Sequence, residues 1–454
     1  MLTMKLLSRT AGVALLGAAA FAPNAATAQV MMPVAPQSQP VVLKGATIHT
    51  VTKGTIQNGT IVLENGKITA IGGADVPTPR AAKVVDLTGK HIYPGLIDAY
   101  STVGITEIGA VDVSNDIRER GDFNPNVRAE VAFNAESRHI GTTRSAGVLV
   151  AFSTPDGGVV SGLSSAMSLE GWTWEEMSMK GAAALNVRWP DPNARPGGGF
   201  GGGGPGGPNA GPRQAPKSYA EQVQELKNFF AEARAYRDAA KAGQTVRSDV
   251  KYAAMIPALD GAIPVVVAAD GVAQMNDAIT WAKQEGLKLV IRGGADAIHV
   301  APRLKTENVP VILTSTMAAP DREYEGYDAV YSLPAKLHAA GVKFAIAGGS
   351  GALYSNRLPW DAGVAVAFGL PEEEALKAVT INAAEMMGIA DKVGSLEVGK
   401  QGTLLITTGT PLDMTSNIDQ AYIQGRELNM MDIQKWFFQK YMEKIKQQQP
   451  KPVP

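Results

Sequence analysis

The residues best suited to chemistry follow a short apolar run in the first quarter of the chain. This run, His-Ile-Tyr-Pro-Gly-Leu-Ile over residues 91–97, ends at Asp98, and Tyr100 and Thr102 follow at alternate positions. Such a run predicts a buried strand whose polar last residues reach a functional edge. A carboxylate beside a phenol or a hydroxyl could transfer protons, which makes Asp98 the candidate catalytic residue. Asp98 could equally be structural and bond the backbone or a neighbouring hydroxyl.

Three further polar residues are pocket candidates together with Tyr100 and Thr102. Asp156 lies in Ser-Thr-Pro-Asp-Gly-Gly, Asp270 follows a Val-rich run, and Ser350 follows Ala-Gly-Gly. Oxygen-only metal sites need six or more ligands, so scattered acids of this kind are commonly just solvated. A serine nucleophile would need a general base, and no histidine is well placed to act as that base. The chain has five: His49, His91, His139, His299 and His338. We therefore expect no metal site from these residues.

Composition excludes several kinds of site and partner. The chain contains no cysteine, which excludes disulfides, thiolate metal sites and a cysteine nucleophile. The 42 Lys and Arg residues nearly balance the 43 Asp and Glu residues, so nothing points to a nucleic acid as partner.

The N-terminus is typical of a secretory signal. Lys5 and Arg9 precede an apolar stretch over residues 11–22, and Ala26-Thr27-Ala28 offers small residues for cleavage. The apolar stretch is too short to span a bilayer as a helix. We expect residues 1–28 to be a signal peptide, and the mature protein to be exported, periplasmic or secreted, with no membrane span.

The body of the chain has the pattern of an α/β protein. From about residue 145 to 350, apolar strand candidates alternate with helical stretches, which favours a parallel α/β fold with a barrel as the leading candidate. Residues 41–90 form short β-rich runs with Asn58-Gly59 and Asn65-Gly66, both typical of hairpin turns. Ser218 and Glu221 predict the capped start of a helix.

Three segments stand outside this pattern. Residues 29–40 are a Pro/Gln-rich linker, and residues 196–212 hold ten Gly and four Pro in seventeen positions, which predicts a disordered surface insertion. Residues 429–454 predict a C-terminal helix and tail. Because apolar stripes usually meet their own core, we expect Trp436, Phe437 and Tyr441 to dock on the body, with a partner or a membrane surface as the alternative.

Three motifs in order carry a family resemblance. They are Gly-Lys-His-Ile-Tyr-Pro-Gly-Leu-Ile-Asp at 89–98, Gly-Leu-Pro-Glu-Glu-Glu-Ala-Leu-Lys-Ala-Val-Thr-Ile-Asn-Ala-Ala-Glu at 369–385, and Gly-Ile-Ala-Asp-Lys-Val-Gly-Ser-Leu-Glu-Val-Gly-Lys at 388–400. Together they resemble the amidohydrolase superfamily, in the imidazolonepropionase-like subgroup. The resemblance spans residues 41–428. It implies a (β/α)8 TIM-type barrel over residues 94–393, and a small composite β-sandwich built from both chain ends, residues 41–93 plus 394–428.

The resemblance also implies a metal centre that this sequence does not supply. Family members hydrolyse amide or other C–N bonds with zinc or another divalent metal, which activates a bound water. The usual His-x-His pair falls here on Tyr100 and Thr102, and neither residue is a good zinc ligand. A later histidine falls on Ala268, the next near Arg292, and the last acid within Ala347-Gly-Gly-Ser350. We therefore expect degenerate ligand positions, and we assign no cofactor.

Two functions remain open at this point. The first is a hydrolase of non-peptide C–N bonds, in amides or cyclic amides, with an atypical or lost metal centre. The second is a catalytically inactive member that binds a ligand or serves as the partner subunit of an active relative. Either function implies a small amide or peptide-like ligand. Both a homo-oligomer and a hetero-oligomer with such a relative are open.

Overall fold

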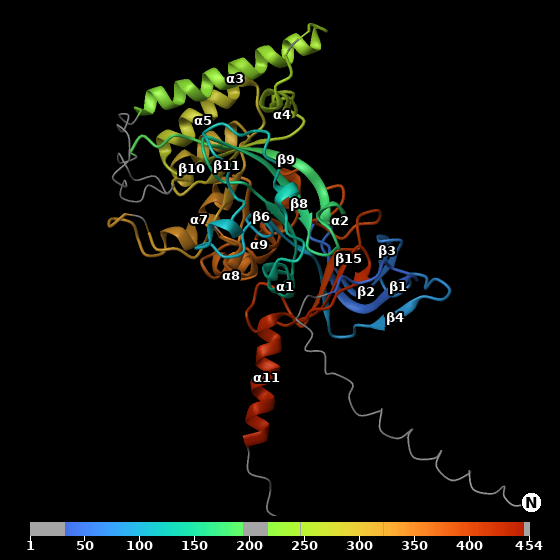
Figure 1. Ribbon diagram of the computed structural model, residues 1–454. Coiled ribbons are helices and arrows are strands. Elements are labelled where there is room, and N and C mark those ends of the chain that lie inside the picture. The colour runs from blue at the N-terminus through green and yellow to red at the C-terminus, as the bar shows by residue number, and fades with distance from the viewer. Residues whose placement is uncertain (1–31, 194–216, 246, 321, 350, 449–454) are drawn as a thin grey trace, which may run out of the picture. The chain divides into compact units, whose positions relative to one another are not determined.

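Eight strands form a nearly closed barrel at the centre of the computed structural model, which describes residues 32–193, 217–245, 247–320, 322–349 and 351–448 (Figure 1). In spatial order they run β13, β12, β11, β10, β9, β8, β7, β6. Their bounds are β6 (Leu96–Ser101), β7 (Val148–Ser153), β8 (Val160–Ser168), β9 (Ser178–Arg188), β10 (Val265–Ala269), β11 (Leu289–Gly293), β12 (Val311–Leu313) and β13 (Phe344–Ile346). Their apolar runs are almost wholly buried, as expected for strands covered on both faces.

One strand departs from the parallel pattern. β8 pairs antiparallel with both β7 and β9, whereas the other neighbouring pairs in this sheet are parallel. The cause is the length of the connections. Only residues 154–159 join β7 to β8, and a parallel partner would need a crossover of a dozen or more residues. The chain therefore returns beside itself before β9 restores the common direction.

Helices connect the remaining strands and cover the barrel. The longest, α3, begins at the capping box that Ser218 and Glu221 form, as the sequence predicts. The helices are α1 (Arg138–Ser145), α2 (Trp174–Met177), α3 (Tyr219–Lys241), α4 (Val250–Leu259), α5 (Val272–Glu285), α6 (Ala301–Thr306), α7 (Ala329–Ala340), α8 (Leu358–Ala367), α9 (Glu372–Ala378) and α10 (Ile381–Met386). Short 3-10 helices are η1 (Asp112–Ser114), η2 (Ala129–Ala132), η3 (Ala297–Val300) and η4 (Ala352–Arg357).

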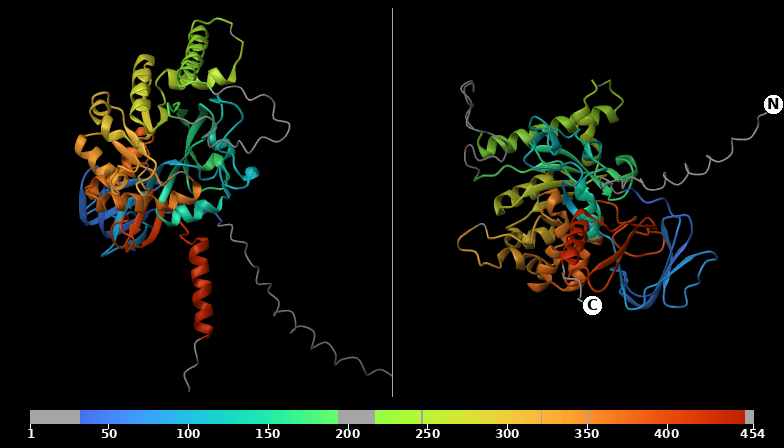
Figure 2. Two further views of the ribbon diagram at one scale, coloured as in Figure 1. Left: turned by 90° about the vertical axis from the view of Figure 1, so that its left-hand side faces the viewer. Right: turned by 60° about the horizontal axis from the view of Figure 1, so that its bottom comes forward.

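A second sheet joins both ends of the described chain. Its key pairing is antiparallel, between β5 (His91–Pro94) and β14 (Leu404–Thr407), and Figure 2 shows the blue and red strands together. The other strands are β1 (Val41–His49), β2 (Thr55–Glu64), β3 (Lys67–Gly72), β4 (Lys83–Asp86), β15 (Ile418–Ile423) and β16 (Arg426–Glu427). The predicted fold class, an α/β barrel with a composite β domain, is confirmed. The predicted residue boundaries of the two domains stay predictions.

The two Asn-Gly pairs behave differently. Asn65-Gly66 forms the hairpin between β2 and β3, with φ of 50° and 77°. The hairpin expected at Asn58-Gly59 is wrong, because this pair lies inside β2, where the register against β1 shifts. Asn58 adopts a positive φ of 49°, and a Cβ on Gly59 would lie 2.4 Å from Cδ1 of Ile48. The glycine therefore admits close packing at a bulge rather than a turn.

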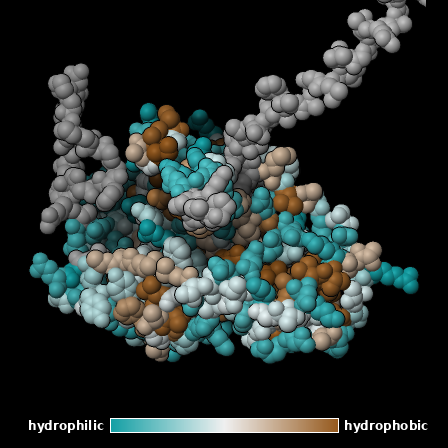
Figure 3. Space-filling view, turned by 90° about the horizontal axis from the view of Figure 1, so that it is seen from below, coloured by the Kyte–Doolittle hydropathy of each residue, from teal (hydrophilic) through white to brown (hydrophobic). Residues whose placement is uncertain are grey.

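The predicted C-terminal helix exists as α11 (Ile433–Gln448), but the expected docking is wrong. None of its residues is buried. Trp436, Phe437 and Tyr441 are 37%, 42% and 54% exposed. The face seen from below Figure 1, the side on which α11 lies, shows apolar groups among polar ones (Figure 3). Within the described part of the chain, no helix is both long and apolar enough to cross a lipid bilayer.

Two sequence expectations fall where the structure gives no description. The predicted signal peptide, residues 1–28, and the Gly/Pro-rich insertion, residues 196–212, lie outside the described residues. The part of the linker that is described, residues 32–40, contains no helix or strand.

Candidate functional site

Two arginines meet at one end of the barrel because three strands run in register. Arg188 is the last residue of β9 and pairs with Ala268 of β10, which in turn pairs with Arg292 of β11. All three therefore lie at the same level, near the carboxyl ends of parallel strands, where barrel active sites are found. The methyl side chain of Ala268 leaves the space between the two arginine side chains open.

Asp156, in the loop after β7, is the counter-charge for both arginines. Its carboxylate accepts a hydrogen bond from Arg188 Nη2 at 2.5 Å, from Tyr100 Oη at 2.8 Å and from Arg292 Nη1 at 3.4 Å. Burial alone would raise the pKa of Asp156, but the two guanidinium groups and the hydrogen bonds outweigh it and lower the pKa to about 2. Asp156 is therefore ionised at neutral pH.

Tyr100, near the end of β6, connects this network to the barrel wall. The guanidinium carbon of Arg292 lies 4.1 Å from the centre of the Tyr100 ring, a cation–π contact between two buried side chains. Burial raises the pKa of Tyr100 to about 12, against the lowering effect of Arg292. The phenol is therefore a proton donor to Asp156 and not a base.

Asp98 lies deeper than the arginine network and is fully buried. One carboxylate oxygen accepts from the backbone N–H of Tyr100 at 3.3 Å and of Gly348 at 3.2 Å, while the other has no hydrogen-bond partner among the described residues. Burial, reinforced by the neighbouring Asp361 carboxyl, raises the pKa of Asp98 to about 7. Because Gly348 follows β13 and Asp98 belongs to β6, this side chain links the two ends of the barrel sheet.

The other sequence candidates lie apart from this cluster. Thr102 accepts a hydrogen bond from the backbone N–H of Ala352 at 2.8 Å, which is a structural contact. Asp270, exposed after β10, accepts from the backbone N–H of Ala295 at 3.4 Å. Ser350 lies outside the described residues. The structure thus brings Tyr100 and Asp156 into contact and does not bring Thr102 or Asp270 to them.

Sequence reasoning missed both arginines. Each ends an apolar run, Ala-Ala-Leu-Asn-Val-Arg over 183–188 and Leu-Val-Ile-Arg over 289–292. A cation at the end of a buried strand resembles an ordinary surface residue unless its partner is known. That partner, Asp156, lies 32 residues before Arg188 and 136 before Arg292.

The residues at the mouth do not fit the divalent metal that the family resemblance implies. The positions where it places ligands carry a phenol, a hydroxyl, a methyl group and a guanidinium, and the guanidinium of Arg292 lies against Tyr100. Among the described residues, no three His, Cys, Asp or Glu side chains converge to hold a metal ion. A resident cation in the form of Arg292 would repel a metal ion at this place. We derive no reaction step through a metal.

Asp98 predicts a specific dependence of stability on pH. Its pKa is about 7 in the native state against 3.8 for the ordinary group, so between these values the native state holds a proton that the unfolded chain has released. The stability from this proton is complete below pH 3.8 and is lost as the pH rises toward 7. Asp98→Asn keeps the acceptor oxygen and should stabilise the protein at pH 8 by roughly 2–4 kcal/mol.

Chemical denaturation at pH 4, 6 and 8 measures this effect. Burial also raises the pKa of Asp361, to about 6. The variant should therefore still lose some stability as the pH rises, but less than the parent protein. An Asp98→Asn protein that loses as much stability between pH 4 and pH 8 as the parent would contradict the assignment.

The chain is similar to amidohydrolases in sequence and in structure. A family model described as the amidohydrolase family matches residues 218–441. The crystal structure of an amidohydrolase from Thermotoga maritima MSB8 matches with a TM-score of 0.75 and 26% identity, over 86% of this chain and 99% of that one. No curated protein matches the chain.

Two more distant crystal structures share the fold. Phenylurea hydrolase B matches with a TM-score of 0.53 and 14% identity, over 86% of this chain and 97% of its own. A prolidase in complex with N-methylphosphonate-L-proline matches with a TM-score of 0.51 and 16% identity, over 86% of this chain and 100% of its own. The family match over residues 218–441 and the Thermotoga structure agree with the barrel and its composite sheet, and they make the chain similar to amidohydrolases.

Proposed function

We propose that the barrel mouth binds a small amide or peptide-like molecule through its carboxylate. The observation that carries this proposal is the pair of arginines on one aspartate. Two guanidinium charges face one carboxylate, so one positive charge at the mouth is uncompensated within the network. Arginine presents five N–H donors in a fork that suits a carboxylate.

Unused donors support the same conclusion. Arg188 and Arg292 each donate one hydrogen bond to Asp156, and Arg292 also interacts with the Tyr100 hydroxyl. Each guanidinium has five N–H groups, so several remain available to a ligand. The side chain of Arg188 is 52% exposed and can reach a ligand, while that of Arg292 is 10% exposed and held in place by Tyr100. The pair thus combines an accessible arginine with a pre-organised one.

The function supported best is ligand binding without metal-assisted hydrolysis, alone or as the partner subunit of an active relative. A hydrolase of non-peptide C–N bonds is the second candidate, and Asp98 is the observation in its favour. A carboxyl with a pKa of about 7 can exchange a proton at neutral pH. Asp98 is 0% exposed, however, so a substrate would reach it only if the residues above it moved.

Binding should depend on Arg188 and on the ligand's carboxylate. Calorimetric titration with N-acyl amino acids and dipeptides should detect binding that weakens about 10–100-fold in Arg188→Gln, because a hydrogen bond to a charged group is worth roughly 1.5–3 kcal/mol. The same compounds with the carboxylate amidated should bind no better than this variant. Arg138→Gln changes an exposed arginine on α1 and serves as the matched control.

Two results would separate the candidates. Unchanged affinity in Arg188→Gln, or equal affinity for the amidated compounds, would refute carboxylate recognition at this site. Turnover of the same compounds or of hydantoin-like rings that Asp98→Asn abolishes while binding persists would favour the hydrolase.

We also propose that the protein is exported, on the support of Lys5, Arg9 and the apolar stretch before Ala28. In the native host, fractionation and N-terminal sequencing should find a chain that begins at Gln29 outside the cytoplasm. An intact N-terminus on cytoplasmic protein would contradict this. The three ordered motifs support the imidazolonepropionase-like subgroup as a further proposal.

A further inference from the structure

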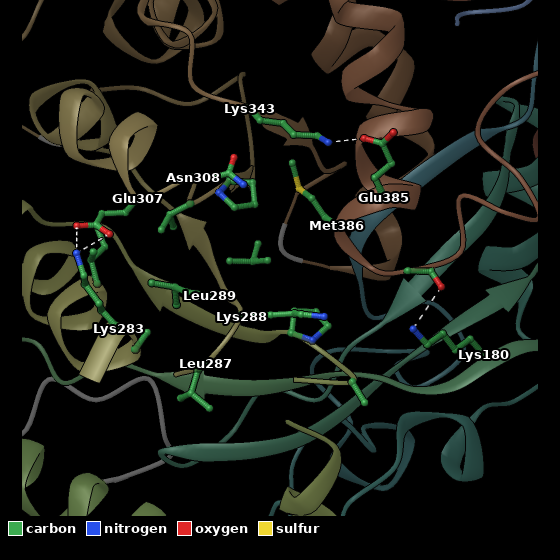
Figure 4. A pocket seen from close by; sticks show the side chains of 18 residues that line it. Lys180, Lys283, Leu287, Lys288, Leu289, Glu307, Asn308, Lys343, Glu385 and Met386 are labelled. Carbon is green, nitrogen blue, oxygen red and sulfur yellow. Dashed lines mark hydrogen bonds and ion pairs between the residues drawn. The ribbon is translucent and has the colours of Figure 1, made fainter. Parts of the chain in front are cut away.

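A cavity of about 600 Å³ opens at the end of the barrel opposite the arginines. It is lined by residues that precede or begin strands: Lys180 in β9, Pro264 before β10, Lys288 before β11, Pro310 before β12 and Lys343 before β13. Figure 4 shows Lys180, Lys288 and Lys343 reaching this cavity from separate elements. The cavity therefore belongs to the amino-terminal face of the barrel, apart from the site described above.

Positive charge dominates the lining. Four lysines and two glutamates face the cavity. Lys283 is paired with Glu307 at 2.7 Å, and Lys343 is paired with Glu385, as the dashed lines in Figure 4 mark. The side-chain ammonium of Lys288 forms no ion pair or hydrogen bond with any described residue.

Lys180 is not neutralised by an ion pair either. Its ammonium group donates to the backbone carbonyls of Met387 at 3.1 Å and Gly388 at 3.3 Å. Burial lowers its pKa, and the nearby charges of Lys392 and Lys288 lower it further, against the opposite effect of Asp391. Like charges held together in a partly buried place favour an anion between them.

Apart from Asn308, the remaining lining residues are apolar or glycine. Ile279, Leu287, Leu289, Val309 and Met386 are among the apolar side chains that line the cavity. We propose that this cavity is a second ligand site, for a small organic anion whose carboxylate or phosphate lies between Lys180 and Lys288 and whose apolar body lies against these side chains. The site is independent of the proposed carboxylate site at the mouth.

Calorimetry with octanoate, octyl phosphate and octanol tests this site. The two anions should bind, with octanol at least 10-fold weaker, and Lys288→Ala should weaken both anions at least 5-fold. Lys336→Ala, an exposed lysine on α7, is the matched control. A stronger response to octanoate or to octyl phosphate identifies the preferred head group. Binding insensitive to Lys288→Ala, equal binding of octanol, or no binding of either anion would overturn the proposal.

The exposed helix α11 carries a second inference from different observations. Ile433, Phe437, Tyr441 and Ile445 recur at every fourth residue and form one stripe, which Phe438 and Met442 widen. The large apolar side chains of this helix are between 37% and 67% exposed. On a helical projection, Lys440 borders the stripe on one side, Lys435 and Lys446 border it on the other, and Lys444 lies near its first edge, between Ile433 and Phe437.

We infer that α11 lies on an anionic lipid surface. Aromatic side chains flanked by lysines are typical of helices that lie in the interface between lipid head groups and acyl chains. Charge favours this occupant over a second copy of the helix, because four lysines against Glu443 give each copy a net charge of +3 that repels another. The stripe would enter the interface while the lysines meet anionic head groups.

Co-flotation with vesicles tests this inference on the full mature chain. The protein should bind vesicles of phosphatidylglycerol and phosphatidylcholine, bind pure phosphatidylcholine at least 10-fold less, and lose binding in Phe437→Ser/Tyr441→Ser. Gln439→Ser/Gln447→Ser on the polar side is the control. Equal binding to neutral vesicles, no binding to either, or a concentration-dependent dimer that the Phe437/Tyr441 variant abolishes would overturn it.

Discussion

The ion-pair network of Asp156 with Arg188 and Arg292 is the constraint on which the barrel mouth depends. A buried guanidinium is costly without a counter-charge, so Arg292 can remain within the barrel only while Asp156 stays ionised beside it. The low pKa of Asp156 and the hydrogen bond from Tyr100 are consequences of the same arrangement. The network joins β6, β9, β11 and the loop after β7 at a single point.

The strand register explains why the network can form. Ala268 stands between the two arginines in adjacent strands, so a small side chain occupies the position where the family resemblance places a histidine. The antiparallel return of β8 brings the chain back to β9 within a short distance, and β9 then delivers Arg188 to the same edge as Asp156. The barrel framework is similar to that of amidohydrolases, and a charged network lies at the edge where the family resemblance implies metal ligands.

The sequence predicts the framework better than the site, for physical reasons. Strand–helix alternation of apolar runs predicts the barrel. The two-ended sheet is implied only by the family resemblance that the three ordered motifs carry. The hairpin predicted at Asn58-Gly59 is wrong because an Asn-Gly pair can occupy a bulge as well as a hairpin turn. Tyr100 and Asp156 are identifiable as polar residues at strand ends. Arg188 and Arg292 are not identifiable from the sequence, because their role depends on Asp156, which only the fold brings near. The helix α11 shows that amphipathic spacing alone does not reveal what the apolar face contacts.

We propose that an arginine–aspartate network occupies the place that the family resemblance gives to a metal centre. Elemental analysis of the purified protein, incubated with zinc and manganese and then dialysed, tests this most directly. We expect much less than one metal ion per chain, with the same result in Asp156→Asn. One or more ions bound per chain, and lost when Asp98 or Asp156 is replaced, would contradict it.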